Sequence, residues 1–178
     1  MKIEDNFLDQ EEFDKLQELM IGSNCWPPFT WVYTAGIDSK DDVDKFQFIH
    51  TFYNTHMPQS SFMNELNPIL ELIKAISLLR IKANLLTRTP NIIENAFHQD
   101  IDSFDDENRK TIFPEKLKQW TTSIFYMNTN NGYTEFEDGT KVESVANRMV
   151  TFPGDMKHRG TSCTNEKTRV VINFNYFE

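Results

Sequence analysis

The spacing of apolar residues predicts a helix near the start of the chain. Residues 9–21 carry an apolar stripe at helical spacing. Asp9 is a candidate N-cap, and Glu12 three residues later completes a variant of the capping box. Leu8 and Phe13 stand at the two positions of a hydrophobic staple, which would fix the entry of the chain into this helix.

The pattern then alternates between strand and helix up to residue 87. Residues 46–53 alternate aromatic and polar side chains, which predicts a half-buried strand. Apolar residues at helical spacing over 69–79 predict a second helix, with Asn67 as its cap and Pro68 in its first turn. Residues 81–87 predict the next strand.

Beyond Thr121 the pattern is that of continuous β-structure. Asn131-Gly132 and Asp138-Gly139 each predict a hairpin turn.

Upstream, the aromatic segment 26–33 is broken by two prolines and predicts a loop entering a strand. Helices first and strands afterwards predict an α+β fold. Since no repeat, low-complexity tract or linker divides the chain, we expect residues 1–178 to form a single domain.

Composition narrows the class of protein. The 178 residues suffice for a sizeable core, and 39% are hydrophobic, so the chain is expected to be globular. A net charge of −9 disfavours nonspecific binding to nucleic acid or to an anionic membrane. The acidic, polar N-terminus does not resemble a secretory signal, and no apolar run is long enough to span a bilayer. We therefore expect a cytoplasmic protein in which Cys25 and Cys163 are reduced thiols. Its oligomeric state stays open.

A His-x-Asp triplet is the strongest chemical signal. On a strand, residues i and i+2 point to the same face, so His98 and Asp100 can reach one metal ion together. His158 downstream offers the third ligand of a two-histidine, one-carboxylate iron site. Such triplets also arise by chance. His50, which shares a face with three phenylalanines, and His56, in a predicted loop, are weaker candidates.

The sequence around His158 supports the site. Residues 149–158 read as a strand and a turn that deliver His158, and residues 168–176 read as the next strand. Arg169 stands near the start of that strand, and its guanidinium suits bidentate binding of a carboxylate. The alternative is a surface arginine, but the apolar residues that follow predict a buried strand, where an unpaired arginine would be costly.

This arrangement resembles that of the iron- and 2-oxoglutarate-dependent oxygenases, in their prolyl 4-hydroxylase-like branch. The resemblance is most specific over residues 80–176 and also rests on the position of Arg169 shortly after His158. It implies a double-stranded β-helix, or jelly-roll, buttressed by N-terminal helices. Helical support is then expected over about 1–80 and the catalytic jelly-roll over about 81–178.

The resemblance also assigns residues to a co-substrate pocket. Tyr126 ends a segment similar to the family's tyrosine-leucine-asparagine strand, where the Tyr hydroxyl shares the co-substrate carboxylate with the basic residue. Residues 131–134 are similar to a glycine-glycine-x-threonine segment, which implies that Thr134 lines the pocket. Asn84 lies on a strand that flanks the site in this fold. The plainer alternatives are a core tyrosine and, for Asn84, a solvated strand face.

The implied reaction is hydroxylation of a C–H bond with Fe(II), 2-oxoglutarate and O2, with ascorbate as a reductant. Asp100 favours hydroxylation over halogenation, because related halogenases lack this carboxylate. A prolyl residue or free proline is the first expectation for a small-molecule or peptide substrate, and residues 26–33 and 101–120 are expected to select it. The second segment is either a lid or a plain surface loop.

Other functions stay open. The rivals are a noncatalytic cupin-like metal- or sugar-binding jelly-roll and an oxygenase of a different small molecule. Nucleic-acid demethylation is disfavoured by the acidic charge and by the absence of a second arginine in the strand of Arg169.

Overall fold

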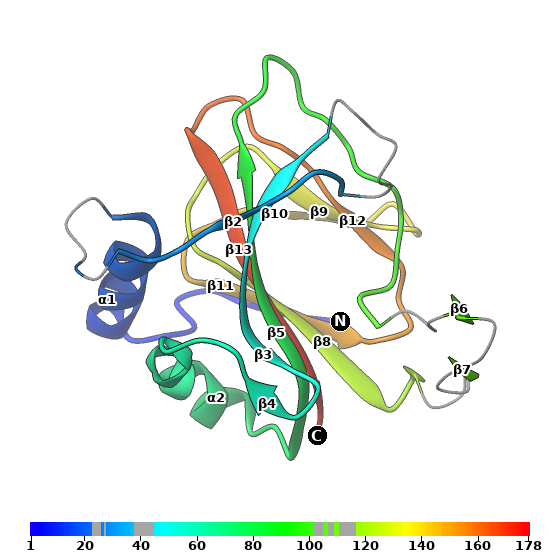
Figure 1. The fold of residues 1–178 in the computed structure, drawn as a ribbon. Helices are drawn as coiled ribbons and strands as arrows, with labels where there is room; N and C mark the ends of the chain where they lie inside the picture. The colour runs from blue at the N-terminus through cyan, green and yellow to red at the C-terminus, as the bar shows by residue number, and fades with distance from the viewer. Residues whose placement is uncertain (23–25, 27, 38–44, 102–104, 107–108, 111–116) are drawn as a thin grey trace.

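Two antiparallel sheets and a helical layer make up the fold of the chain in a computed structural model (Figure 1). The structure describes residues 1–22, 26, 28–37, 45–101, 105–106, 109–110 and 117–178. The elements in chain order are β1 (Lys2–Glu4), α1 (Gln10–Ile21), β2 (Val32–Thr34), β3 (Gln47–Asn54), β4 (Met57–Pro58), the 3-10 helix η1 (Met63–Leu66), α2 (Asn67–Ile73), β5 (Ser77–Thr87), β6 (Asp105–Asp106), β7 (Arg109–Lys110), β8 (Trp120–Tyr126), β9 (Tyr133–Phe136), β10 (Lys141–Glu143), β11 (Arg148–Pro153), β12 (His158–Gly160) and β13 (Thr168–Phe177).

The larger sheet has the strand order β1-β11-β8-β13-β5-β3-β2, with β4 paired to β3. The smaller sheet has the order β10-β9-β12, and β6 pairs with β7 separately. Every strand pair is antiparallel. This arrangement confirms the predicted α+β class and is that of a double-stranded β-helix. Strands β1 to β4, which precede residue 81, belong to the larger sheet alongside the strands of the C-terminal half.

The period-two alternation of the long strands sorts their side chains onto two faces. Phe125 of β8 and Ile172 of β13 pack with the helices in the main core. Their neighbours Ile124, Tyr126 and Val171 pack instead toward the smaller sheet. The functional residues of β5 and β13 lie on this second face, between the sheets.

The first helix forms as predicted, but its cap differs in detail. Helix α1 spans Gln10–Ile21 with Asp9 as N-cap, and no side-chain capping bond is formed there. The predicted capping box is therefore wrong. Leu8 and Phe13, the predicted staple pair, are both buried in the same core cluster. Burial of these side chains anchors the helix start without help from Asp9.

The second helix is shorter than predicted. Helix α2 ends at Ile73, because Lys74 adopts the left-handed conformation with φ 52° and ψ 38°. Strand β5 then begins at Ser77, and this first residue pairs with the last residue of β13, Phe177. Asn67 is the first helical residue rather than the cap. The apolar run that suggested helix up to residue 79 is therefore strand beyond Ile76, where sheet pairing outweighed the helical spacing.

One of the two predicted hairpins is present. Gly139 has φ 86°, and its amide donates to the carbonyl of Phe136 in the tight turn between β9 and β10. The Asn131-Gly132 turn is not a hairpin, because β8 and β9, the strands on either side of it, belong to different sheets. This turn instead carries the chain from the larger sheet to the smaller one.

The aromatic segment at residues 26–33 packs away from the site. Phe29 and Trp31 pack against the main core, where Phe29 contacts the ring of His50 at 4.1 Å between centroids. No described residue of 26–33 lines the cavity described below, and the expectation that this segment selects the substrate stays a prediction. Most of the 101–120 segment, which was expected to be either a lid or a plain surface loop, lies outside the described residues. Cys25 lies outside them as well. No helix in the described parts of the chain has the length and apolar character needed to cross a membrane.

Candidate metal centre and co-substrate pocket

A cavity of ≈ 1060 Å³ brings the predicted site residues together. Its walls come from β3, β5, β8 and β13 of the larger sheet, from β9 and β12 of the smaller sheet, and from the segment at residues 95–101. The proposed metal ligands and the proposed carboxylate-binding arginine all line it: His98, Asp100, His158 and Arg169. Two of the other predicted residues, Asn84 and Thr134, line it as well.

His98, Asp100 and His158 converge on one point. Their potential ligand atoms all lie within 4.8 Å of one another. Oδ1 of Asp100 is 3.5 Å from Nε2 of His98 and 3.8 Å from Nε2 of His158. The backbones of the two histidines form an isolated antiparallel bridge, which holds His98 against β12. Residues 60 positions apart in the sequence are thereby fixed side by side.

The two imidazoles are oriented alike. Nδ1 of each ring faces a backbone carbonyl two residues earlier, that of Ala96 or Met156, at 3.2 Å. A proton on Nδ1 would turn the Nε2 lone pair toward the point where the ligand atoms converge, as in metal-binding histidines whose other ring nitrogen donates to a carbonyl. His158 Nε2 is buried and has no hydrogen-bond partner among the described residues. A buried nitrogen without a partner is costly, and a bound metal ion would satisfy it.

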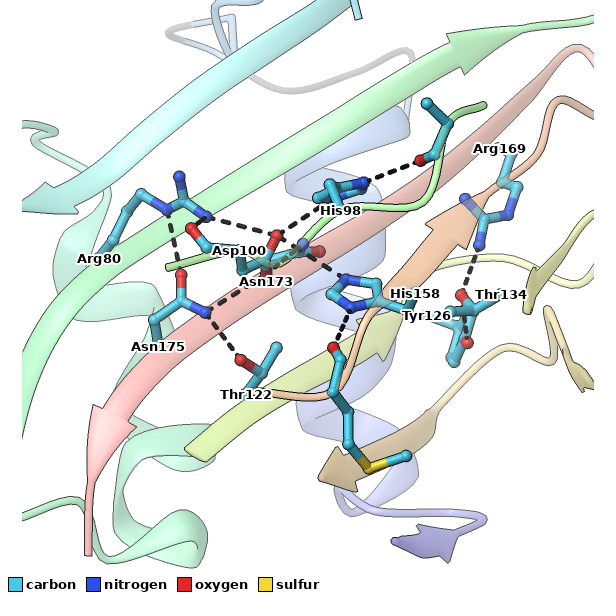
Figure 2. A network of polar contacts seen from close by, with 12 residues as sticks. Arg80, His98, Asp100, Thr122, Tyr126, Thr134, His158, Arg169, Asn173 and Asn175 are labelled. Carbon is cyan, nitrogen blue, oxygen red and sulfur yellow. Dashed lines mark hydrogen bonds and ion pairs between the residues drawn. The ribbon is translucent and has the colours of Figure 1, made fainter. Parts of the chain in front are cut away.

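Asp100 is fixed by its second oxygen. Oδ2 accepts hydrogen bonds from Asn173 at 2.9 Å and from Asn175 at 3.3 Å (Figure 2). Arg80 donates to the Asp100 backbone carbonyl at 2.9 Å and to Asn175 Oδ1 at 3.1 Å. This network holds the carboxylate so that Oδ1 faces the two histidines.

Electrostatics favour the metal-binding protonation state of both buried ligands. Burial alone would raise the pKa of Asp100, but the hydrogen bond to His98 and the charges of His158 and Arg80 outweigh it and hold the pKa well below the ordinary value. Burial lowers the pKa of His158, although Asp100 opposes this. An ionised carboxylate and a neutral imidazole are the forms that bind a divalent first-row metal.

Arg169 is a buried cation without a carboxylate partner among the described residues. Its side chain is 3% exposed. Nε donates to Ser144 Oγ at 2.8 Å and Nη2 donates to Thr134 Oγ1 at 3.1 Å. Burial lowers the pKa of Arg169, while Tyr126 and Cys163 oppose the shift. A buried charge that only neutral groups contact calls for an anion, and the cavity beside it has room for one.

Two glycines shape the space around this arginine. A Cβ on Gly160 would lie 3.3 Å from Arg169 Nη1, so the bare backbone leaves the end of the guanidinium open. Gly160 and His158 are two residues apart on β12 and therefore on one face, roughly 6.6 Å along the strand. The guanidinium therefore lies beside the strand that carries His158, and both line the same cavity.

Gly132 allows the close approach of Arg169 to the turn. A Cβ at position 132 would lie 2.6 Å from Arg169 Cδ and 2.7 Å from the Ser162 carbonyl oxygen. We expect Gly132→Ala to displace the arginine, to lower stability by about 1–3 kcal/mol and to weaken 2-oxoglutarate binding measured by calorimetry. Gly139→Ala is the control, since it adds strain at φ 86° with no contact within 4 Å. Equal 2-oxoglutarate affinity in the two variants would contradict this role of Gly132.

The remaining candidate residues lie at the cavity wall, behind it, in the core and at the surface. Thr134 lies between Arg169 and Tyr126, whose hydroxyl donates to Thr134 Oγ1 at 2.8 Å. Tyr126 is fully buried beneath Thr134, and burial raises its pKa, so it positions the threonine from behind. His50 packs in the core and faces the Thr30 carbonyl and Ser60 Oγ, each at 2.7 Å, as expected for a core histidine. His56 is exposed in a turn.

Several functional side chains were not identified from the sequence. Arg80, Asn173 and Asn175 hold Asp100, and nothing in the sequence pattern showed this role. Their only signal was polar residues alternating with apolar ones in buried strands. Ser144, which orients Arg169, carried no signal at all.

Comparisons with known proteins find similarity to solved structures but none to a family model or to a curated sequence. The structure of a prolyl-4-hydroxylase from Pseudomonas putida aligns with this chain at a TM-score of 0.61 and 14% sequence identity. The alignment covers 99% of this chain and 92% of the hydroxylase chain. The viral collagen prolyl hydroxylase of Paramecium Bursaria Chlorella virus-1, solved with 2-oxoglutarate, aligns at a TM-score of 0.57 and 16% sequence identity. The alignment covers 99% of this chain and 95% of the viral chain.

Relatives with other reactions share the fold. The non-heme α-ketoglutarate-dependent epimerase SnoN of nogalamycin biosynthesis aligns at a TM-score of 0.63 and 12% sequence identity. The alignment covers 99% of this chain and 76% of the epimerase chain. The chain therefore has the double-stranded β-helix fold of the iron- and 2-oxoglutarate-dependent oxygenases, and prolyl hydroxylases are among its structural neighbours, as the sequence resemblance predicted.

Proposed function

We propose that the chain is an Fe(II)- and 2-oxoglutarate-dependent dioxygenase that hydroxylates a C–H bond of its substrate. One observation carries the proposal: a ligand cluster with a buried, unpartnered histidine nitrogen shares a cavity with a buried arginine that has no carboxylate partner among the described residues. A metal ion would satisfy the first group, and an anionic co-substrate would satisfy the second.

The donor set fits iron. Two imidazoles and one carboxylate form the facial triad of non-heme Fe(II) oxygenases, which leaves positions open for co-substrate and O2. His98, Asp100 and His158 would hold the ion, and Asn173 and Asn175 would fix the carboxylate from behind. When bound, iron with 2-oxoglutarate and O2 supplies the oxidation, in which one oxygen atom enters the C–H bond while 2-oxoglutarate becomes succinate and CO2.

The residues around Arg169 fit 2-oxoglutarate. The guanidinium would take the distal carboxylate, and Ser144 and Thr134 hold it in place through Nε and Nη2. Tyr126 acts through Thr134, whose hydroxyl it engages. Asn84 on β5 lines the same cavity and offers an amide to the co-substrate. The apolar side chains of Leu86, Ile124 and Val171 also line the cavity.

A prolyl residue or free proline remains our first substrate proposal. It draws support from the prolyl hydroxylases among the structural neighbours and from the sequence resemblance. The co-substrate half of the pocket carries that resemblance, and this half does not choose the substrate. The epimerase neighbour shows that the fold also serves other substrates and other outcomes, so an oxygenase of a different small molecule is the alternative.

The noncatalytic alternative is less well supported. A cupin-like metal- or sugar-binding jelly-roll would use His98 and His158 but has no need for a buried arginine beside the metal site. We further propose that the protein works in the cytoplasm on a small-molecule or peptide substrate, with no nucleic acid or membrane as partner. The net charge of −9 disfavours nucleic acid and anionic membranes as partners.

The test is co-substrate turnover. The purified protein, loaded anaerobically with Fe(II) and supplied with ascorbate, should convert 2-oxoglutarate to succinate in the presence of O2. Mass spectrometry of proline and prolyl peptides after incubation should show a gain of one oxygen. The gain on another substrate alone would reject proline and keep the oxygenase, and metal binding without any succinate would favour the noncatalytic jelly-roll.

A further inference from the structure

His98 is the least buried of the three proposed metal ligands. Its side chain is 43% exposed, against 5% for Asp100 and 3% for His158. An imidazole with this exposure is not fixed by core packing, so its direction depends on the backbone that carries it. That backbone is the segment at residues 93–98, which runs beside β12 and is joined to it by backbone hydrogen bonds (Figure 1).

The 93–98 segment departs from regular strand pairing by one residue. Glu94 is bridged to Thr161, and His98 is bridged to His158. The four steps from Glu94 to His98 therefore lie opposite only three steps of the partner strand, which is the pattern of a β-bulge. Because a shift of one residue turns the following side chains to the other face, the extra residue decides whether His98 faces the cavity.

Arg159 of β12 contacts this segment on both sides of the extra residue. Its Nη2 is 2.6 Å from Glu94 Oε2, and the ring of Phe97 covers the guanidinium, with 4.5 Å between the ring centroid and Cζ. Residues three apart on a regular strand point to opposite faces. Glu94 and Phe97 nevertheless meet one arginine, which places the bulge between them.

The guanidinium is itself held by the neighbouring strand. Glu135 of β9 is the ladder partner of Arg159, and its Oε2 accepts from Nε at 2.8 Å and from Nη2 at 2.6 Å. Tyr133 of the same strand donates to Glu94 Oε1 at 2.6 Å. A single exposed ion pair contributes little, but several charges held in a network are an exception. The 93–98 segment is thus tied through Arg159 to two strands of the smaller sheet.

Arg159 lies outside the cavity. It alternates along β12 with His158 and Gly160, which both line the cavity, so its side chain is on the opposite face of the sheet. Any effect of Arg159 on a metal ion must therefore pass through the 93–98 segment or through its charge. The two routes differ in sign, because a nearby cation disfavours binding of a divalent metal ion.

We propose that Arg159 is a positioning residue for the metal centre: by holding Glu94 and Phe97 it fixes the bulge, and with it the face to which His98 points. The inference rests on the metal site of the proposed function and adds a residue that the site depends on from outside the cavity. Loss of the arginine would let the segment shift its pairing and turn His98 away from Asp100 and His158.

The test is the metal affinity of variants in this contact. Arg159→Met keeps an unbranched side chain without the ion pairs and should weaken Mn(II) binding roughly 10-fold, the lower end of the loss typical for outer-shell partners. Arg159→Lys should restore part of the affinity, because it keeps the charge. Glu94→Gln should act in the same direction, and the two changes combined should cost little more than either alone, since they remove one interaction.

A spectroscopic signature separates positioning from general stability. The visible absorption of bound Co(II) reports its ligands, and in Arg159→Met it should shift toward the spectrum of His98→Ala. Lys157→Met is the matched control: Lys157 also adjoins His158 in the sequence, but its ion pair is with Glu137, outside the 93–98 segment. It should bind Mn(II) at least as tightly as the unaltered protein.

Circular dichroism checks that each variant is folded, and Glu94→Gln decides the matter if Arg159→Met does not fold. Wild-type Mn(II) affinity in a folded Arg159→Met or Glu94→Gln variant would reject the positioning role and leave the metal site in place. An equal loss of affinity in Lys157→Met would reject it too. If the unaltered protein binds no Mn(II), the positioning role and the proposed function fall together.

Discussion

Replacing His158 with alanine is expected to abolish metal binding and all turnover of 2-oxoglutarate. His158 is the most buried of the three candidate ligands, and its Nε2 has no other partner among the described residues. Loss of an outer-shell partner typically costs 10–100-fold in metal affinity, so loss of a ligand itself should cost at least about 100-fold. Calorimetric titration with Mn(II), a redox-inert stand-in for Fe(II), measures the effect without turnover.

The control separates this site from the chain's other histidines. His56→Ala removes an exposed imidazole in a turn and should bind Mn(II) like the unaltered protein. The backbone bridge between residues 98 and 158 does not depend on the side chain, so His158→Ala should still fold, which circular dichroism would verify. Wild-type Mn(II) affinity in a folded His158→Ala variant would remove His158 from the site.

Much of the β-structure was predictable because its signals are local. Alternation along residues 46–53 follows directly from the pleat of a half-buried strand. The apolar run after Arg169 fits β13, which is buried on both faces. The His-x-Asp geometry is local in the same sense, since two residues on one strand-like segment share a face whatever surrounds them. The structure brings His98, Asp100, His158 and Arg169 to one cavity, as the sequence suggested.

The errors arose where distant pairing decided the outcome. The residues around 76–79 fit a helix by spacing, but the partner that made them a strand is β13, almost a hundred residues away. The Asn131-Gly132 turn looked like a hairpin because its residues suit one, yet the next strand pairs in another sheet. The network of Arg80, Asn173 and Asn175 around Asp100 joins three segments, and no single segment reveals it.

Arg169→Ala is expected to weaken 2-oxoglutarate binding while leaving metal affinity intact. The guanidinium contacts only hydroxyl groups and an aromatic face in the described structure, so the co-substrate carboxylate would be its main charged partner. Removing one side of a buried ion pair typically costs about 3–5 kcal/mol, which is roughly a 100- to 1,000-fold loss of affinity or more. Calorimetry with the Mn(II)-loaded protein measures it directly.

Two further variants sharpen the test. Arg169→Lys keeps the charge but loses the fork that bonds Ser144 and Thr134 at once, so its affinity should fall between those of alanine and arginine. Arg88→Ala removes an exposed arginine and should change nothing. If Arg169→Ala bound 2-oxoglutarate as tightly as the unaltered protein, the carboxylate would have to lie elsewhere in the cavity. The other cations that line it are Arg80 and Lys82 on β5, which would then be the next candidates for that contact.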